Sequence, residues 1–151
     1  MTSATSPALS VVIPVYNAAD TLPELLRRLT GVLDGVQRPY EIVLVDDGSA
    51  DSSWEVIRGL AGRYPTMGAV RMMQNGGQHQ ATLHGLALAR GEVVVTMDDD
   101  LQHPPDQVPC LLRALDEHPD TDAELGWFPA KHHVWYRNLA SALVGRLVDR
   151  T

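Results

Sequence analysis

The sequence lacks the features that mark several specialised classes of protein. A single cysteine, Cys110, excludes a disulfide within the chain and indicates a reducing compartment. No apolar run approaches the roughly 18 residues of a membrane span, and the first residues show no basic segment followed by an apolar one. We therefore expect no signal peptide and a cytoplasmic location, either in solution or at the cytoplasmic face of the membrane.

Basic residues are scarce as well. The chain has 12 Lys and Arg against 19 Asp and Glu, which gives a formal net charge of −7. A general nucleic-acid-binding protein needs a basic face, so we expect no nucleic-acid partner. The sequence also has no GxGxxG or Walker A motif, which argues against a dinucleotide-binding fold and a P-loop.

What is present fits one folded domain of 151 residues, 44% of them hydrophobic. Apolar runs rich in β-branched residues alternate with segments of helical periodicity. The predicted strands are 9–15, 40–45, 69–73, 92–97 and 123–128. The predicted helices begin after the caps Asp20 and Asp51, span 78–90 with Gly91 at the end, follow Pro104-Pro105, and span 135–148. This alternation predicts a three-layer α/β/α domain over 9–151 with a mainly parallel sheet, after a loose segment over 1–8.

Polar segments follow four of the predicted strands. They are Tyr16-Asn17, Asp46-Asp47-Gly48-Ser49, Asn75-Gly76-Gly77-Gln78 and Asp98-Asp99-Asp100. In a parallel sheet, ligands bind beyond the carboxyl ends of the strands, so we expect these segments to converge on one edge.

The acids that follow the strand EVVVTM indicate a cation site. Adjacent carboxylates repel one another unless a cation offsets their charge. Asp98 and Asp100 are two positions apart and can aim at one ion as the strand bends into a loop. Hard oxygen ligands suit Mg²⁺ or Mn²⁺, which take their remaining ligands from water and substrate phosphates. The alternative is a solvated acidic loop.

Two further strand-end segments are candidates for binding a nucleotide. A carboxylate at Asp46 or Asp47 can accept a hydrogen bond from a nucleobase N–H or a ribose hydroxyl, and Gly48 permits a tight turn. The alternative is a strand-to-helix turn capped by Asp51. The segment from Asn75 to Gln78 allows the backbone to approach a ligand closely.

The motifs together resemble glycosyltransferase family 2, the inverting nucleotide-sugar transferases with the GT-A fold, a Rossmann-like α/β/α arrangement. The matching segments are VVIPVYNAADTLPELL (11–26), EIVLVDDGSADSSWEVI (41–57) and NGGQHQATLHGLALARGEVVVTMDDDLQHPPD (75–106). Within the family, DDDLQHPPD is most similar to the polyprenol-phosphate branch, which includes the dolichyl-phosphate mannose synthase type and its undecaprenyl-phosphate relatives. The implied activity is metal-dependent transfer of a sugar from a UDP- or GDP-linked donor to polyprenyl phosphate.

The resemblance also assigns roles to individual residues. It implies that the nucleotide pocket is lined by Pro14, Tyr16, Asn17 and Asp46. It implies that Asp98, Asp100 and Gln102 hold the metal, and that Asp99 assists the nucleotide or the sugar. Ala18 departs from the pattern, because relatives usually carry Glu after Tyr-Asn at this point.

The basic C-terminal region is a candidate for binding the acceptor. Residues 131–151 carry a net charge of +3, in contrast to the acidic total. A lipid phosphate is already anionic and needs cations rather than a general base, so Lys131 and Arg137 are predicted catalytic residues beside Asp98 and Asp100. A basic amphipathic helix lying on an anionic membrane is a compatible alternative.

Family members generally extend beyond this length, so we expect the acceptor side of the domain to be incomplete. That expectation leaves two other functions open. One is a family 2 transferase acting on a carbohydrate or small-molecule hydroxyl. The other is a non-catalytic domain that binds a nucleotide sugar.

Overall fold

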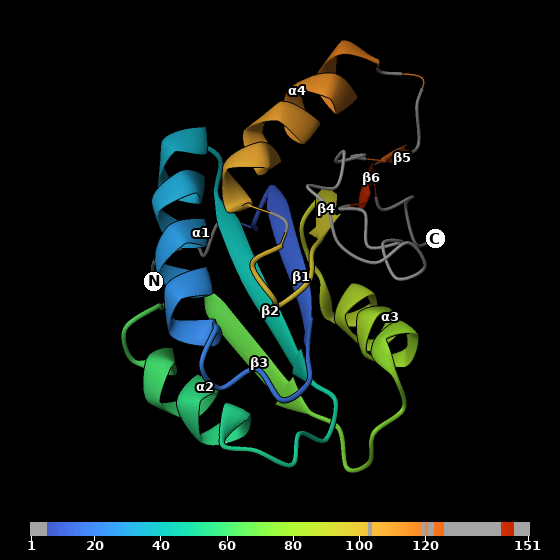
Figure 1. Ribbon diagram of the computed structural model, residues 1–151. Coiled ribbons are helices and arrows are strands. Elements are labelled where there is room, and N and C mark those ends of the chain that lie inside the picture. The colour runs from blue at the N-terminus through green and yellow to red at the C-terminus, as the bar shows by residue number, and fades with distance from the viewer. Residues whose placement is uncertain (1–5, 103, 119, 121–122, 126–142, 147–151) are drawn as a thin grey trace.

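A six-stranded sheet forms the centre of the fold in the computed structural model, which describes residues 6–102, 104–118, 120, 123–125 and 143–146 (Figure 1). The strand order is β3-β2-β1-β4-β6-β5. The strands are β1 (Leu9–Val15), β2 (Tyr40–Asp46), β3 (Met67–Arg71), β4 (Val93–Thr96), β5 (Ala123–Leu125) and β6 (Leu143–Arg146). The first four are parallel, and β6 pairs antiparallel with both β4 and β5. The predicted, mainly parallel α/β sheet is confirmed.

Helices cover both faces of this sheet (Figure 1). They are α1 (Leu22–Val36), α2 (Ser53–Ala61), α3 (Gln78–Leu88) and α4 (Val108–Glu117), the last preceded by a 3₁₀ turn, η1 (Pro105–Gln107). Alternate residues of β1 point to opposite faces: Ile13 packs in the core with α1, α2 and α4, whereas Val12 packs with Ala81 of α3. The chain therefore has the three predicted layers.

The leucine stripe of α1 supplies much of the larger core. The predicted set Leu22, Leu25, Leu26, Leu29 and Leu33 is buried to 1% exposure or less. Each buried leucine contributes about 2 kcal/mol, which outweighs the weak N-terminal cap. The prediction that Asp20 is the N-cap is wrong. That position belongs to Thr21, whose hydroxyl donates to the Ala18 carbonyl.

Two glycines, Gly85 in α3 and Gly91 after it, permit close approaches to the sheet. A Cβ at Gly85 would lie 2.3 Å from Val12 Cγ1, so the helix sits directly on β1. A Cβ at Gly91 would lie 2.5 Å from the Ser10 amide nitrogen. The prediction that Gly91 ends the helix is wrong: α3 ends at Leu88, and Gly91 is required by its contact with β1.

The structure corrects two predicted elements. The third strand begins and ends two residues earlier than expected, which places Arg71 at its carboxyl end. The predicted helix over 135–148 is wrong for Leu143–Arg146, which form β6. Apolar residues four positions apart suggested a helix, but pairing with β4 satisfies backbone groups that an open sheet edge would leave unpaired. Residues 135–142 lie outside the described ranges.

Across the described ranges, no helix combines the length and apolar character needed to cross a membrane.

Candidate functional site

The polar segments that follow β1 to β4 meet beyond the carboxyl ends of these strands, as the sequence predicts. The Tyr16 amide donates to Asp99 Oδ2 at 3.0 Å, which joins the loops after β1 and β4. Gln78 Nε2 donates to Asp98 Oδ1 at 2.6 Å, which joins the start of α3 to the same acidic loop. We call this side of the sheet the carboxyl edge.

Asp46 ends β2 as a fully buried carboxylate. Its Oδ1 accepts the Ser49 amide at 3.2 Å, and Oδ2 lies 3.1 Å from Arg71 Nε. The Oδ2–Arg71 contact lacks hydrogen-bond geometry, so within the described structure Oδ2 has a charged neighbour but no hydrogen-bond donor. Buried polar atoms without such a partner are rare, and at a ligand site they are candidates for contact with the ligand.

Arg71 is a site residue that sequence reasoning missed. Besides its contact with Asp46, it donates to the Ser49 carbonyl at 3.1 Å, and its guanidinium lies 6.0 Å from the centre of the Trp54 ring. The available signal was its place at a strand end, which the predicted strand over 69–73 concealed by placing Arg71 inside the strand.

Asp47 has a different role from its neighbour Asp46. It is 2% exposed, and its two oxygens accept the Gly76 amide at 2.7 Å and the Gly77 amide at 2.9 Å. Asn75 Oδ1 accepts the Gly77 amide as well, at 3.1 Å. Both residues, predicted to bind nucleotide, therefore hold the loop that leads into α3.

The loop after β1 contains the other predicted nucleotide residues. Pro14 is buried inside β1, and the Tyr16 side chain is half exposed. Asn17 has a left-handed φ of 52°, and its Oδ1 accepts the Ala50 amide at 2.9 Å. Tyr16 and Asn17 are thus both exposed, and Asn17 ties the loop to the segment after β2.

The segment after β2 also supports part of the alternative interpretation, in which it is a strand-to-helix turn. Asp51 Oδ1 accepts the amide of Ser53, the first residue of α2, at 2.9 Å. Burial opposes ionisation of Asp51, but the hydrogen bonds from Ser53 and Ala19 hold its pKa below the ordinary value. Asp51 thus binds the first residue of α2, but the prediction that Asp51 is the N-cap is wrong, because that position belongs to Ser52. The same turn follows the buried Asp46.

Each of the three acids after β4 has a distinct environment. Asp98 bonds with Gln78, Asp99 with the Tyr16 amide, and Asp100 Oδ1 accepts the Gln102 amide at 2.9 Å. Burial, together with the neighbouring carboxylates, raises the pKa of Asp99 to about 6 against the opposing hydrogen bond from the Tyr16 amide. Part of this rise comes from repulsion among negative charges that lie close together in the loop.

The donor set fits a hard divalent cation in part. Asp98 and Asp100 offer carboxylate oxygens, the ligands that Mg²⁺ and Mn²⁺ prefer, and Asp100 is exposed. No cluster of three or more His, Cys, Asp or Glu suited to a metal occurs among the residues that the structure describes. Two protein carboxylates fit an ion that takes its remaining ligands from substrate phosphates and water. Gln102 contacts Asp100 through its backbone amide.

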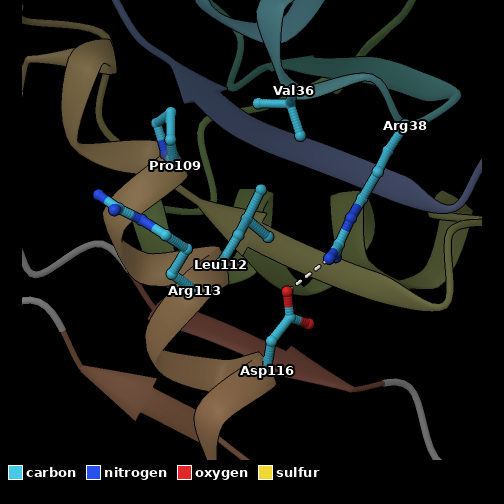
Figure 2. A pocket seen from close by; sticks show the side chains of 6 residues that line it. All are labelled: Val36, Arg38, Pro109, Leu112, Arg113 and Asp116. Carbon is cyan, nitrogen blue, oxygen red and sulfur yellow. Dashed lines mark hydrogen bonds and ion pairs between the residues drawn. The ribbon is translucent and has the colours of Figure 1, made fainter.

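The predicted acceptor residues Lys131 and Arg137 lie outside the described ranges. A separate shallow hollow of about 160 Å³ lies between the end of α1 and α4, and Figure 2 shows its lining. Its charged residues include Arg38 and Asp116, which form an ion pair with each other. None of the predicted site residues lines this hollow.

The opposite side of the sheet, where β1, β2 and β4 begin, contains another buried acid. We call it the amino edge. Glu41 is 7% exposed and accepts hydrogen bonds from Ser10 Oγ at 2.7 Å, from the Arg90 amide at 2.7 Å and from Arg90 Nε at 2.9 Å. Burial alone would raise the pKa of Glu41, but these bonds hold it below its ordinary value of 4.5.

Comparison with curated proteins gives a relative of known type. The chain is 42% identical over 144 residues to the undecaprenyl-phosphate 4-deoxy-4-formamido-L-arabinose transferase of Edwardsiella ictaluri (strain 93-146). The match covers 95% of this chain and 44% of that relative, so the chain spans less than half of the relative's length.

Solved structures share the fold. The mannosyltransferase PcManGT from Pyrobaculum calidifontis, in complex with GDP-Man and Mn²⁺, is similar with a TM-score of 0.67 and 27% identity, covering 80% of this chain and 35% of that one. S. aureus TarS 1-349 in complex with UDP-GlcNAc has a TM-score of 0.67 and 23% identity, covering 91% of this chain and 45% of that one. The predicted GT-A fold is therefore confirmed. Because the model of the family described as "Glycosyl transferase family 2" matches residues 10–143, the chain belongs to glycosyltransferase family 2.

Proposed function

We propose that this chain forms the donor side of a metal-dependent, inverting glycosyltransferase that moves a sugar from a nucleotide sugar to polyprenyl phosphate. The observation that carries the proposal is the meeting, in a family 2 chain, of the buried Asp46 with the acids after β4 at one edge of the sheet. Two comparisons support it. The Edwardsiella relative is an undecaprenyl-phosphate sugar transferase by name, and the Pyrobaculum structure contains GDP-Man and Mn²⁺.

The nucleotide half of the donor binds between the loops after β1 and β2. Asp46 Oδ2 lacks a hydrogen-bond donor, so it accepts one from a nucleobase N–H or a ribose hydroxyl. Tyr16 supplies a half-exposed aromatic ring on which a base can stack, and the next residue, Asn17, joins its loop to the loop after Asp46 by donating its amide to Ser49 Oγ at 3.0 Å. Pro14 and Asn17 fix the path of the loop that presents the ring.

The diphosphate half faces the acids after β4. Asp98 and Asp100 would hold Mg²⁺ or Mn²⁺, with Gln102 beside them. When bound, the ion neutralises the negative charge that develops on the departing nucleoside diphosphate. Asp99 keeps the acidic loop against Tyr16 through the bond to its amide, and so links the metal side of the site to the nucleotide side.

The acceptor explains why the site needs no general base. A polyprenyl phosphate oxygen is anionic near neutral pH, so it attacks the anomeric carbon without first losing a proton. Cations must instead hold the acceptor beside a negatively charged donor, and Lys131 and Arg137 supply them in this proposal. The same basic region would bring the protein into peripheral contact with the cytoplasmic face of a membrane.

Calorimetry and a transfer assay test the proposal. We expect UDP or GDP to bind, and Mn²⁺ to strengthen that binding. We also expect Asp100→Ala to abolish transfer from the nucleotide sugar to polyprenyl phosphate while leaving the circular dichroism spectrum unchanged, because Asp100 is exposed. Failure of both nucleotides to bind, or Mn²⁺-dependent transfer retained by Asp100→Ala, would contradict the proposal. Transfer to a carbohydrate hydroxyl alone, or binding without transfer, would instead favour one of the two alternatives.

A further inference from the structure

Gln78 makes the contact that joins α3 to the acidic loop. It is the first residue of the helix, its side chain is exposed, and its Nε2 donates to Asp98 Oδ1 at 2.6 Å. An exposed glutamine loses rotamer freedom when it is held in one orientation, so a single orientation requires a compensating interaction. A hydrogen bond to a charged carboxylate supplies about twice the stabilisation of a neutral one.

The helix that carries Gln78 is fixed against the sheet. Ala81 is fully buried one turn into α3. One turn further, Gly85 is so close to β1 and β2 that an added Cβ would lie 2.3 Å from Val12 and 3.2 Å from Val45. Since neither the helix nor the sheet can shift without repacking, Gln78 projects from a fixed point towards the end of β4.

The loop that leads into the helix is fixed as well. Asp47 binds the Gly76 and Gly77 amides with its two oxygens, and Gly77 is the residue before the helix, with a φ of 87°. The turn after β2 packs on the same loop, because a Cβ at Gly48 would lie 2.9 Å from the Asn75 amide nitrogen. A continuous series of bonds thus runs from Asp47 through the loop to Gln78 and Asp98.

We propose that Gln78 is a positioning residue that orients the Asp98 carboxylate for the divalent cation, and that Asp47 positions Gln78 through the loop it binds. The proposal rests on the proposed function, which gives Asp98 a cation to hold. It assigns Asp47 and Gln78 to the metal side of the site, in place of the direct nucleotide contact predicted from the sequence. Partners that orient a ligating carboxylate typically affect metal affinity by about 10- to 100-fold.

The neutral amide explains why a glutamine serves at this position. Three adjacent carboxylates attract any nearby positive charge. A lysine at residue 78 would pair permanently with Asp98 and offset the charge that attracts the cation. An amide fixes one carboxylate oxygen and leaves the net charge of the loop unchanged.

Nucleotide binding by the 151-residue chain tests the role of Gln78. The affinity for the nucleoside diphosphate is measured with Mn²⁺ and with EDTA, and the ratio of the two is the metal-dependent increment. In Gln78→Leu we expect the increment to fall by about tenfold, with the affinity in EDTA and the circular dichroism spectrum unchanged. The matched control Gln80→Leu removes the same amide two residues further along α3, and its increment should equal that of the wild type. A wild-type increment in Gln78→Leu would overturn the proposal.

Two further variants test the charge at residue 78 and the link from Asp47 to Gln78. Gln78→Lys should lose the increment yet bind nucleotide more tightly than the wild type in EDTA, because the ammonium group replaces part of the cation's charge. Asp47→Asn should also lower the increment, and Asp47→Asn combined with Gln78→Leu should lower it no further than Asp47→Asn alone. Additive losses would show that Asp47 acts independently of Gln78 and would overturn that part of the proposal.

A ligand-free measurement distinguishes this proposal from the proposed function. In the NMR spectrum without metal or nucleotide, the Gln78 side-chain amide signal, assigned by its absence in Gln78→Leu, should shift in Asp98→Asn. An unchanged signal would overturn the Gln78–Asp98 contact, whatever the protein binds. A wild type whose nucleotide affinity is the same in Mn²⁺ and EDTA would contradict the proposed metal dependence, and the positioning role with it.

Discussion

The two ends of β2 carry buried acids that differ in their hydrogen bonding. At the amino edge, Glu41 accepts bonds from Ser10 and Arg90, and the pKa of its carboxyl lies below the ordinary value. At the carboxyl edge, Asp46 is fully buried, yet its Oδ2 has no hydrogen-bond donor in the described structure. One strand therefore carries a fully hydrogen-bonded carboxylate at one end. At the other end it carries a carboxylate with one oxygen that has no hydrogen-bond donor.

This difference separates acids that maintain the fold from acids that are available to a ligand. A buried carboxylate with all its partners is stabilising, and removing one partner leaves the others unpaired. A buried carboxylate with an unsatisfied oxygen costs stability until a ligand completes it. Substitutions at the amino edge should therefore affect the free energy of unfolding. Substitutions of carboxyl-edge acids that lack a hydrogen-bond partner should affect ligand binding.

The largest effect on stability is expected at Gly91, beside Ser10 on the amino edge. In Gly91→Ala the new Cβ would lie within 2.6 Å of two backbone atoms of β1, and backbone cannot rotate away as a side chain can. We expect a loss of about 3 kcal/mol in the free energy of unfolding, measured by urea denaturation. Gly31→Ala is the matched control: Gly31 lies in α1 with no atom within 4 Å of the added Cβ, and this change should stabilise the protein by about 1 kcal/mol. Equal effects at the two glycines would contradict the packing argument.

Glu41→Gln should have the next largest effect. The amide cannot accept the Arg90 guanidinium bonds as a carboxylate does, so we expect a loss of about 2 kcal/mol at pH 7. The pKa of Glu41 is lowered in the folded state, so its stabilisation is present above pH 4.5 and disappears as the pH falls through the lowered value. Urea denaturation from pH 7 to 3 should therefore show a shallower acid loss in the variant than in the wild type.

An exposed ion pair provides the control for Glu41. Glu24 pairs with Arg27 on the surface of α1 at 2.8 Å. Glu24→Gln removes the same charge where water replaces the lost partner, so we expect no measurable change in stability. A loss comparable to that of Glu41→Gln would show that net charge, rather than the buried bonds, decides the result.

Among the buried acids, the smallest effect on stability is expected for Asp46→Asn. The Asn oxygen can still accept the Ser49 amide, and the removal of a buried charge offsets the lost Arg71 contact, so the change should stay below about 1 kcal/mol. Nucleotide affinity should fall by about tenfold, as calorimetry would show. Asp47→Asn is the matched control, because an amide NH₂ would face a loop N–H and destabilise the protein by about 2 kcal/mol. If Asp46→Asn destabilised the protein more than Asp47→Asn, the distinction between fully and incompletely hydrogen-bonded acids would be refuted.

Local pattern predicted those parts of the fold that depend on local sequence. β1 was predicted with the bounds that the structure has, and the five leucines of α1 are buried as their spacing indicates. Residues that follow a strand also reach the carboxyl edge because parallel strands share their direction. The sequence was therefore sufficient to identify the side of the sheet where the candidate site lies.

Contacts between distant parts of the chain could not be predicted in the same way. β6 is a strand because β4 offers it backbone partners, and nothing within 143–146 signals that pairing. Arg90 and Glu41 are 49 positions apart, and their bond depends on how α3 crosses the sheet. The roles of Asp46 and Asp47 differ because only Asp47 binds the loop before α3. The sequence has the same residue type at both positions, so it gives no sign of this difference.

The length of α3 is set by β2, one of the two strands on which it lies. Its preceding loop is bound by Asp47, just after β2, and the segment after it is bound by Glu41, near the start of β2. Each residue added to a helix advances it by about 1.5 Å and turns it by about 100°. An insertion or deletion between Gln78 and Leu88 would therefore rotate Gln78 away from the acidic loop or detach one of the two ends. Related chains that keep these bonds should vary in length within their surface loops and keep α3 at its present 11 residues.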